Sequence, residues 1–377
     1  MDEKMIKVIS SKDCLSLEDG VLAGGVDWSV SKKTLVGGLQ QGVEVLEVDN
    51  GSLQFDVILS RGMSVGSITC GAVRLGWDSP VKEVVHPMYM NLHDRGGLGW
   101  LEGFNEWMVR CGVSYAGAPG EDGGVPLTLH GRIGNTPASE VEIVVEETPK
   151  HKIRIRGLVS ERIFKLANFD LWTEISVEIG SRKVCFQDTL INQSEYSQEY
   201  QIIYHANFGS PILEPDARFL GPVKELYPLN EYAGQGLSGF DQFTGPTLDY
   251  GEQVYCMRMN ADDQQATTVM LHNARGNQGV AMHYDIASLP AFNLWKNTDS
   301  SSDGYVTGLE PATGFPFNRS VERDNGRVPL LGPKEKVEFH VAAEVLVDGS
   351  EVVAIRERIE GIQNGELPML HADPPLV

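Results

Sequence analysis

The sequence lacks most of the features that mark membrane, secreted and metal-binding proteins. No hydrophobic run in its 377 residues approaches the ~20 residues that a membrane-spanning helix needs, and the opening stretch MDEKMIKVISSKDC holds no apolar segment like those of secretory signals. The few cysteines are far apart and odd in number, and they form neither a CxxC pair nor a Cys/His zinc spacing; they are Cys14, Cys70, Cys111, Cys185 and Cys256. We therefore expect free thiols in a reducing cytoplasm and no metal site.

Basic residues are also scarce, with 31 Lys and Arg against 52 Asp and Glu, which gives a formal net charge of -21. A surface with this excess of negative charge repels the phosphates of nucleic acids and of anionic membranes, so we expect neither as a partner. The glycine-rich fingerprints of nucleotide and dinucleotide sites are missing, and strands do not alternate with helices in the pattern of a parallel sheet. We therefore expect no bound cofactor. The sequence leaves the oligomeric state open.

Strand patterns dominate the chain from about residue 43 onward. Residues 43–60 show two runs of alternating apolar and polar residues joined by Asp49-Asn50-Gly51, a strong hairpin signal. Similar runs follow, bounded by Gly, Asn or Pro, at 140–159, 171–194, 199–209, 268–285 and 336–347. The 41 glycines suit a fold with many turns. These patterns predict an all-β protein, a large antiparallel sandwich or a closely related architecture with few short helices.

The chain shows no internal repeat and no low-complexity linker, so we predict a single domain over residues 1–377. Its core is expected at about 35–348, after an N-terminal extension over 1–34 and before a C-terminal helix and tail over 349–377. Residues 11–24 suggest a short helix or a small N-terminal layer. Residues 349–362 have the apolar spacing of a helix. Residues 364–377 are Pro-rich and are expected to form an extended tail.

Residues 86–137 differ from the rest because they are rich in Gly, Trp, His and Arg and have poor strand periodicity. A loop of this length in a compact domain is usually functional. Aromatic faces can cover the C–H surface of a pyranose, while polar side chains bond its hydroxyls. We therefore expect this segment to contribute to a carbohydrate site.

Three residues lie where a strand meets a loop, next to Gly, Pro or Asn: His130 in HGRIGN, His205 in YHANFGSP and Glu310 in YVTGLEPAT. Taken singly, each could be a structural residue, and the Glu310 carboxylate could simply project into water. Taken together, an imidazole and a carboxylate facing each other across a sugar would make an acid/base pair near neutral pH. His272, His283 and His340 lie within alternating strands, where a structural role is the simpler interpretation.

Several stretches, in this order along one chain, are similar to the aldose 1-epimerase (galactose mutarotase-like) superfamily, and in particular to a divergent bacterial branch of it. They are LQFDVILSRGMSVGSITCGAVRLGWDSP, GLGWLEGFNEWMVRCG, LTLHGRIGNTPA, YHANFGSPIL, FNLWKNTDSSSDGYVTGLEPAT and LLGPKEKVEFHVAAEVL, within residues 35–348. The sequence departs from the branch where it has Ser60-Arg61-Gly62 in place of Asp-Arg-Gly. The resemblance implies a β-supersandwich with a sugar cleft on the concave face of one sheet.

The resemblance also implies roles for individual residues in an aldose 1-epimerase reaction. Glu310 matches the general base that removes the anomeric proton, and His205 matches the general acid that protonates the ring oxygen. His130 looks like a second histidine that bonds the substrate, and Arg132 like a ligand of a hydroxyl or an anion. Further expected substrate contacts are Trp295, Lys296, Trp107, Asn105 and Arg110. The reaction needs no cofactor or metal, and the expected partner is a small-molecule sugar.

Three other interpretations remain open at the level of the sequence. The protein could be a non-catalytic carbohydrate-binding protein on the same scaffold, because a fold does not fix a function. It could be a lyase or isomerase of an oxidised or acidic sugar, since Arg132 and Lys296 are cationic. Finally, His130, His205 and Glu310 are residue types that can bind a divalent metal, although no HxH or HExxH spacing supports this.

Overall fold

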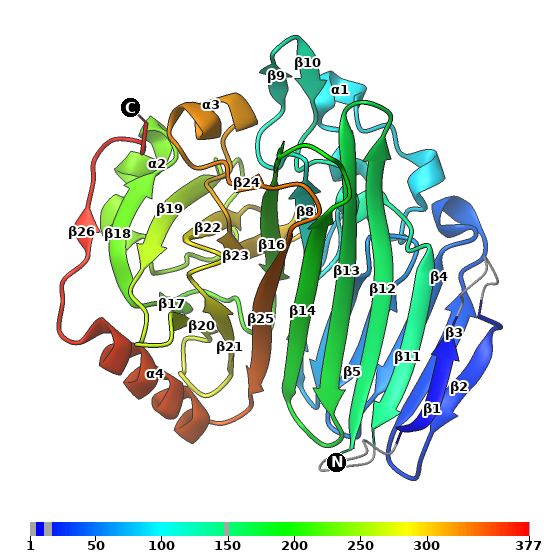
Figure 1. The fold of residues 1–377 in the computed structure, drawn as a ribbon. Coiled ribbons are helices and arrows are strands. Elements are labelled where there is room, and N and C mark those ends of the chain that lie inside the picture. The colour runs from blue at the N-terminus through cyan, green and yellow to red at the C-terminus, as the bar shows by residue number, and fades with distance from the viewer. Residues whose placement is uncertain (1–4, 11–16, 147–150, 377) are drawn as a thin grey trace.

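The computed structural model describes residues 5–10, 17–146 and 151–376, and most of its regular structure is β-strand, arranged in two large sheets (Figure 1). The first sheet has nine strands in the order β1 (Met5–Ser10), β11 (Glu140–Glu146), β12 (Lys152–Ile163), β13 (Ala167–Glu178), β14 (Lys183–Asn192), β25 (Lys336–Leu346), β21 (Gly279–Asp285), β20 (Ala266–His272) and β17 (Arg218–Leu220). The second sheet has 13 strands in the order β2 (Gly20–Gly24), β3 (Ser29–Thr34), β4 (Glu44–Asp49), β5 (Gln54–Ile58), β6 (Ser64–Cys70), β8 (Met108–Val113), β16 (Gln201–Phe208), β23 (Tyr305–Ala312), β22 (Ala291–Thr298), β19 (Gln253–Met259), β18 (Val223–Pro228) and β26 (Met369–Leu370), with β7 (Val73–Leu75) paired to β6.

Among the described strands, the neighbours pair antiparallel except β18 and β26, which are parallel. The predicted large antiparallel all-β fold is therefore confirmed. Two small sheets complete it, one of β9 (Gly120–Asp122) and β10 (Val125–Leu127) and one of β15 (Gln198–Glu199) and β24 (Leu330–Leu331). The α-helices are α1 (Asp94–Gly97), α2 (Glu231–Gln235), α3 (Arg319–Asp324) and α4 (Gly349–Gln363), and the 3-10 turns are η1 (Gly38–Gln40), η2 (Pro87–Tyr89), η3 (Gly99–Gly103), η4 (Ile133–Asn135) and η5 (Leu237–Gly239). Within the described residues, none of these helices has the length and apolar character needed to cross a bilayer.

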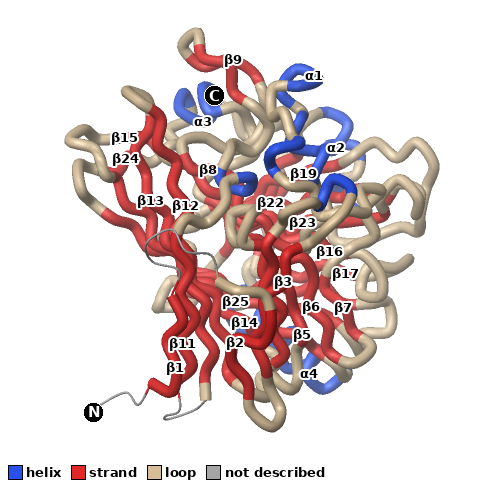
Figure 2. The backbone as a smooth tube through the Cα atoms, turned by 90° about the vertical axis from the view of Figure 1, so that its right-hand side faces the viewer, coloured by secondary structure: helices blue, strands red, loops and turns tan. Residues whose placement is uncertain are grey.

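The main hydrophobic core lies between the two large sheets, which form separate layers in Figure 2. Phe169 of β13, Phe186 of β14 and Phe339 of β25 come from the first sheet, and Phe55 of β5 and Phe208 of β16 come from the second. All five side chains are almost completely buried. The second sheet therefore has one face against the core and a second face that can carry a site, as alternation along its strands requires.

The two ends of the chain are parts of the sheets or pack on them. Residues 20–24 form strand β2, which pairs with β3 and so extends the larger sheet. Of the two alternatives for residues 11–24, a short helix or a small N-terminal layer, the helix is therefore wrong for residues 20–24; residues 11–16 lie outside the described part. The predicted C-terminal helix is confirmed as α4, whose Asp348 N-cap accepts hydrogen bonds from the first turn. The tail continues as β26 along β18, and His371 stacks on Tyr227 with ring centroids 4.0 Å apart.

The segment 86–137 contains a central strand that its sequence does not reveal. Residues 108–113 form β8, which lies between β6 and β16 in the larger sheet. All six residues of β8 are buried, because loops cover one face and the first sheet covers the other. Such a strand shows no alternation of apolar and polar residues, and MVRCGV even places an arginine inside, so the period-two test fails here.

Arg110 of β8 connects the two sheets through an ion pair in the core. Its guanidinium forms a bidentate pair with Asp188 of β14, with the Nη2–Oδ1 distance at 3.0 Å, and it donates to the carbonyl oxygen of Met63 at 3.0 Å. The Tyr204 hydroxyl donates to Asp188 Oδ2 at 2.7 Å. Both charged side chains are fully buried. Arg110 is therefore part of the inter-sheet core, and its predicted contact with a sugar is corrected.

We predict that Arg110→Met lowers the free energy of unfolding by roughly 3–5 kcal/mol, because it leaves the Asp188 carboxylate buried without its partner. Urea denaturation followed by tryptophan fluorescence measures the change. Lys334→Met is the matched control, since it breaks the exposed Lys334–Glu195 pair and should change the stability little. Equal stability of the two variants would contradict the structural role of Arg110.

Candidate active site

A row of side chains crosses the outer face of the larger sheet on the neighbouring strands β16, β23, β22 and β19. In Figure 1 these strands run from the middle of the molecule toward its left side. The pairs Ile203–Ala312 and Ala206–Leu309 fix the register of β16 and β23, so His205 stands opposite Glu310. In the same way Glu310 pairs with Asn293 of β22, and Asn293 pairs with Cys256 of β19. Residues in such positions have neighbouring side chains on one face. The register therefore brings together a histidine and a glutamate that are more than a hundred positions apart.

The imidazole and the carboxylate form a close pair, with His205 Nε2 and Glu310 Oε1 3.2 Å apart. Their side chains are only 6% and 3% exposed. Gly308, two residues before Glu310 on β23, makes this arrangement possible: a Cβ at this position would lie 2.5 Å from Glu310 Oε1 and 3.3 Å from the indole of Trp295. A side chain at position 308 would displace the carboxylate, and this explains why YVTGLEPAT has a glycine at this position.

Aromatic rings surround the pair. The ring of His205 contacts the rings of His130, Phe104 and Trp295, with centroids at 5.3, 5.3 and 5.6 Å, and Trp100 packs against His130 at 4.8 Å. Trp100, Phe104 and His130 are buried, whereas Trp295 is partly exposed and its Nε1 donates to Glu252 Oε2 at 2.9 Å. This cover is apolar and holds the pair away from water. The cover leaves only a few per cent of either side chain accessible from outside.

Burial sets the charge of the pair. Burial, together with a smaller effect of the nearby Glu252 carboxylate, raises the pKa of the Glu310 carboxyl to about 8. Burial also lowers the pKa of His205 to about 4 and holds the pKa of His130 well below its ordinary value. Near neutral pH the pair is therefore a neutral carboxylic acid beside a neutral imidazole, with one proton that can move to a ligand and a free imidazole nitrogen that can accept another.

The structure corrects the expected arrangement of the two groups. They were expected to face each other across a sugar, but they lie side by side on neighbouring strands within 3.2 Å, so no pyranose fits between them. A sugar would instead approach both groups from the same side of the sheet. This geometry suits two oxygen atoms bonded to one carbon of a ligand.

Asn293 belongs to the site although the sequence did not single it out. It is fully buried, stands opposite Glu310 in the sheet, and neither its amide nitrogen nor its amide oxygen has a hydrogen-bond partner among the described residues. A buried amide without partners is costly unless a ligand or water satisfies it. The stretch FNLWK held the signal, because residues 293 and 295 share a face of the strand and Trp295 was already a candidate.

The structure brings four of the predicted residues together, namely Glu310, His205, His130 and Trp295. Arg132 lies two residues beyond His130, but its side chain is exposed and lines a different cavity. Within the described residues, neither Arg132 nor the remaining candidates contact Glu310 or His205.

The other candidates have structural roles, so their predicted contacts with a sugar are corrected. Lys296 is on the inner face of β22, where its Nζ donates to the carbonyl oxygens of Gly239 and Gln242 at 3.1 and 2.7 Å. The Trp107 indole is buried in the main core, 6.0 Å from the ring of Phe186. The Asn105 amide donates to two backbone carbonyls of the preceding loop and so stabilises this turn. Arg110, as described above, links the two sheets. In the described part of the chain, no cluster of three or more His, Cys, Asp and Glu side chains is arranged to hold a metal ion.

We predict that the Glu310 carboxyl titrates with a pKa near 8 and that Glu252→Gln lowers this pKa, because the variant removes a negative charge that opposes ionisation. NMR of 13C-labelled glutamate carboxyls measures the titration, and Glu310→Gln assigns the signal. The matched control is Glu357→Gln on the exposed side of α4, which should leave the titration unchanged. An ordinary glutamate pKa for this signal would contradict the burial argument.

Comparison with known proteins places the chain in a family. The family model described as Domain of unknown function (DUF4432) matches residues 40–345. A search of curated proteins gives no match. A Klebsiella pneumoniae protein provisionally named an aldose 1-epimerase is 40% identical, with a TM-score of 0.91 over 98% of this chain and 95% of that one.

More distant structures share the fold. A galactose mutarotase-like protein of Clostridium acetobutylicum is 13% identical, with a TM-score of 0.57 over 85% of this chain and 98% of that one. The galactose 1-epimerase of Lactobacillus acidophilus is 11% identical, with a TM-score of 0.54 over 84% of this chain and 98% of that one. The chain therefore belongs to the DUF4432 family and has the galactose mutarotase-like fold of the aldose 1-epimerase superfamily.

Proposed function

We propose that the protein is a mutarotase, an enzyme that interconverts the anomers of an aldose by opening and closing the sugar ring. The observation that carries the proposal is the contact of 3.2 Å between His205 Nε2 and Glu310 Oε1 under an aromatic cover. One group can donate a proton and the other can accept one, and this is all that ring opening requires. The names of the Klebsiella and Lactobacillus proteins support the same reaction class.

The chemistry follows from the neutral state of the pair. The protonated Glu310 carboxyl donates its proton to the ring oxygen as the bond from this oxygen to the anomeric carbon breaks, and neutral His205 accepts the proton of the anomeric hydroxyl. The open-chain aldehyde forms, its carbonyl rotates, and closure on the other face returns both protons. The starting charge state is restored, so no proton is gained or lost.

This assignment exchanges the starting roles that the family resemblance implies. In that version Glu310 begins as an ionised base and His205 as a protonated acid. Both versions contain the same number of protons, and both groups alternate between donor and acceptor in the two half-reactions. No cationic side chain among the described residues acts on Glu310, so burial favours the neutral version, which avoids two charges in an apolar site.

The same site offers contacts for the rest of a pyranose. Trp295, partly exposed at the edge of the cover, presents an indole face that suits the C–H surface of a sugar. Asn293 supplies an unpartnered amide beside Glu310, and the Nδ1 atoms of His130 and His205 are also buried without partners. These groups would bond sugar hydroxyls. A non-catalytic sugar-binding protein could use the same contacts, so activity must be tested separately from binding.

We predict that the purified protein accelerates anomer exchange of an aldose and that Glu310→Gln lowers the rate at least ~100-fold while the variant stays folded. The amide has the shape of the carboxyl but cannot transfer a proton. Saturation-transfer NMR between the two anomeric protons measures exchange over a panel of neutral and acidic aldoses. Glu357→Gln should retain full activity. Sugar binding without exchange in the wild-type protein would identify a binding protein instead.

The dependence of kcat/KM on pH should form a bell with limbs near 4 and 8. Below about 4 the imidazole becomes protonated and cannot accept a proton, and above about 8 the carboxyl ionises and cannot donate one. Groups with ordinary pKa values in the opposite roles would give limbs near 4.5 and 6.5. Exchange rates measured between pH 3.5 and 9, with a buffer control for spontaneous mutarotation, separate the two cases. An alkaline limb near 6.5 would contradict the neutral pair.

A further inference from the structure

The proposed reaction uses one nitrogen of His205 as a proton acceptor, and this requirement sets the tautomer of the ring. His205 Nε2 is the nitrogen that lies 3.2 Å from Glu310 Oε1. A neutral imidazole has one nitrogen with a proton and one without. For Nε2 to accept a proton, the ring proton must therefore be on Nδ1. This N–H needs an acceptor within the protein, because the ring is buried.

Asn207 has an acceptor atom in a position to meet this need. It comes two residues after His205 on β16, so the two side chains lie on the same outer face of the larger sheet. Asn207 Oδ1 and His205 Nδ1 are both buried, and neither makes a hydrogen bond of ordinary geometry within the described residues. The two atoms are chemically complementary, because an amide oxygen only accepts and a protonated ring nitrogen only donates.

The nitrogen of the Asn207 amide is anchored, and this orients the oxygen. Asn207 Nδ2 donates to the carbonyl oxygen of Glu106 at 3.1 Å and to that of His205 at 3.4 Å. An amide oxygen in the place of Nδ2 would repel both carbonyl oxygens, so the hydrogen bonds assign the two ends of the amide. The contact with the His205 carbonyl also keeps the amide next to residue 205. On β23, Asn207 is opposite Gly308, which has no side chain to occupy the space.

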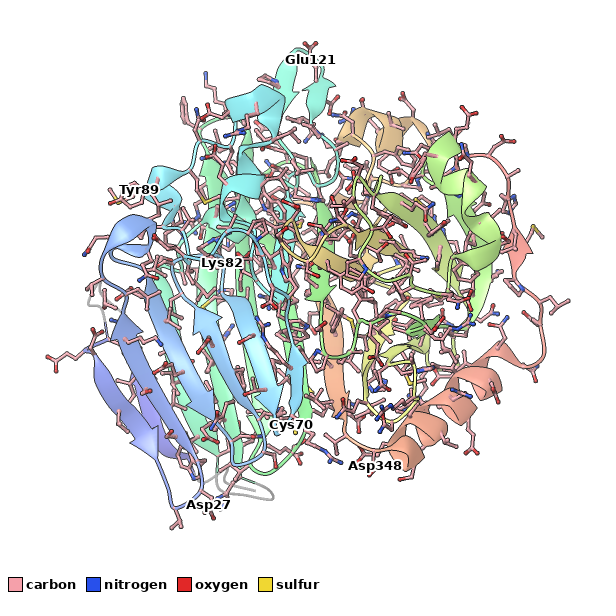
Figure 3. The ribbon with its side chains drawn as sticks, turned by 180° about the vertical axis from the view of Figure 1, so that it is seen from behind. Asp27, Cys70, Lys82, Tyr89, Glu121 and Asp348 are labelled. Atoms are coloured by element: carbon pink, nitrogen blue, oxygen red, sulfur yellow. The ribbon has the colours of Figure 1, made fainter. Side chains whose placement is uncertain are left out.

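The backbone carbonyl that anchors this amide is itself held by buried contacts. The carbonyl oxygen of Glu106 also accepts from Trp77 Nε1 at 3.2 Å, and the Glu106 carboxylate forms a fully buried ion pair with Arg61 at 2.7 Å. The preceding residue, Asn105, donates to two carbonyl oxygens of the loop that the labelled Lys82 marks in Figure 3. The amide is therefore attached to a well-supported part of the backbone.

We propose that Asn207 is a positioning residue: its Oδ1 accepts a hydrogen bond from His205 Nδ1 and so leaves His205 Nε2 free to accept a proton beside Glu310. The hydrogen bond made by one ring nitrogen decides which nitrogen carries the proton. The Asn207 side chain also raises the pKa of His205 against the larger, opposite effect of burial, as an acceptor for Nδ1–H does.

This proposal rests on the proposed reaction and deepens it, because it names the residue that prepares the proton acceptor. It also assigns His205 Nδ1 to Asn207 in place of a sugar hydroxyl. His130 Nδ1 and the Asn293 amide, which are buried without partners among the described residues, remain available to a ligand.

NMR of the ring nitrogens in 15N-histidine-labelled full-length protein reads the tautomer at pH 6 without any sugar. We expect wild-type His205 to carry its proton on Nδ1, with Nε2 at the shift of an unprotonated nitrogen. His205→Gln assigns the signals. Asn207→Leu keeps the size of the side chain but removes the acceptor, so the ring should shift toward the Nε2–H tautomer. The Nε2–H tautomer in wild-type protein would overturn the proposal, and this result depends on no variant.

The matched control is Asn192→Leu at the end of β14 in the other sheet. Asn192 is also fully buried and its amide also donates to backbone carbonyls, so the variant loses similar contacts but should leave His205 in the Nδ1–H form. Asn207→Leu should lower kcat for anomer exchange about tenfold with little change in KM, since fewer molecules begin in the reactive tautomer. An unchanged tautomer in Asn207→Leu, or an equal shift in Asn192→Leu, would show a structural role only.

The two proposals fail separately. Anomer exchange by a wild-type protein whose His205 is the Nε2–H tautomer leaves the reaction standing and removes the role of Asn207. An Nδ1–H tautomer that is lost in Asn207→Leu, in a protein that exchanges no aldose, leaves the hydrogen bond standing and removes the reaction.

Discussion

The candidate active site depends on one constraint, the burial of a carboxyl and an imidazole next to each other, with no cationic side chain of the described residues acting on them. Two ions placed there would lose their hydration, and their mutual attraction would not reliably offset that loss. A neutral pair that shares a mobile proton avoids the cost. Burial accordingly raises the pKa of Glu310 and lowers the pKa of His205, and both shifts favour the neutral form. The same burial that makes the site costly therefore makes one group a donor and the other an acceptor near neutral pH.

The inner face of the larger sheet carries structural contacts, and its outer face carries the candidate active site. On the inner face, Arg110 joins the sheets through Asp188, and Lys296 fixes a loop through backbone carbonyls. On the outer face, Glu310 and His205 meet in register under the aromatic cover. Alternation along a strand decides the role of a residue here, since Trp295 and Lys296 are neighbours in sequence but lie on opposite faces.

Much of the fold and several residues of the candidate site could be predicted from the sequence. Strands that alternate apolar and polar residues and end in clear turns can be recognised from a single sequence. The hairpin at Asp49-Asn50-Gly51 is an example. The buried strand β8 carries none, because both its faces are covered. Sequence also cannot tell a charged residue that faces the core from one that faces a ligand, which is why Arg110 was misassigned. Asn293 was missed because its importance arises from its cross-strand partner Glu310 on β23 and not from its neighbours along the chain.

The central claim is that His205 is a neutral imidazole beside a protonated carboxyl, and 15N NMR of the histidine ring nitrogens tests it most directly. The account predicts that at pH 6 the two nitrogens of His205 have the well-separated shifts of a neutral ring, and that they move toward the imidazolium values only near pH 4. Imidazolium shifts at pH 6 that Glu310→Gln converts to those of a neutral ring would show a charged pair, and would contradict the account.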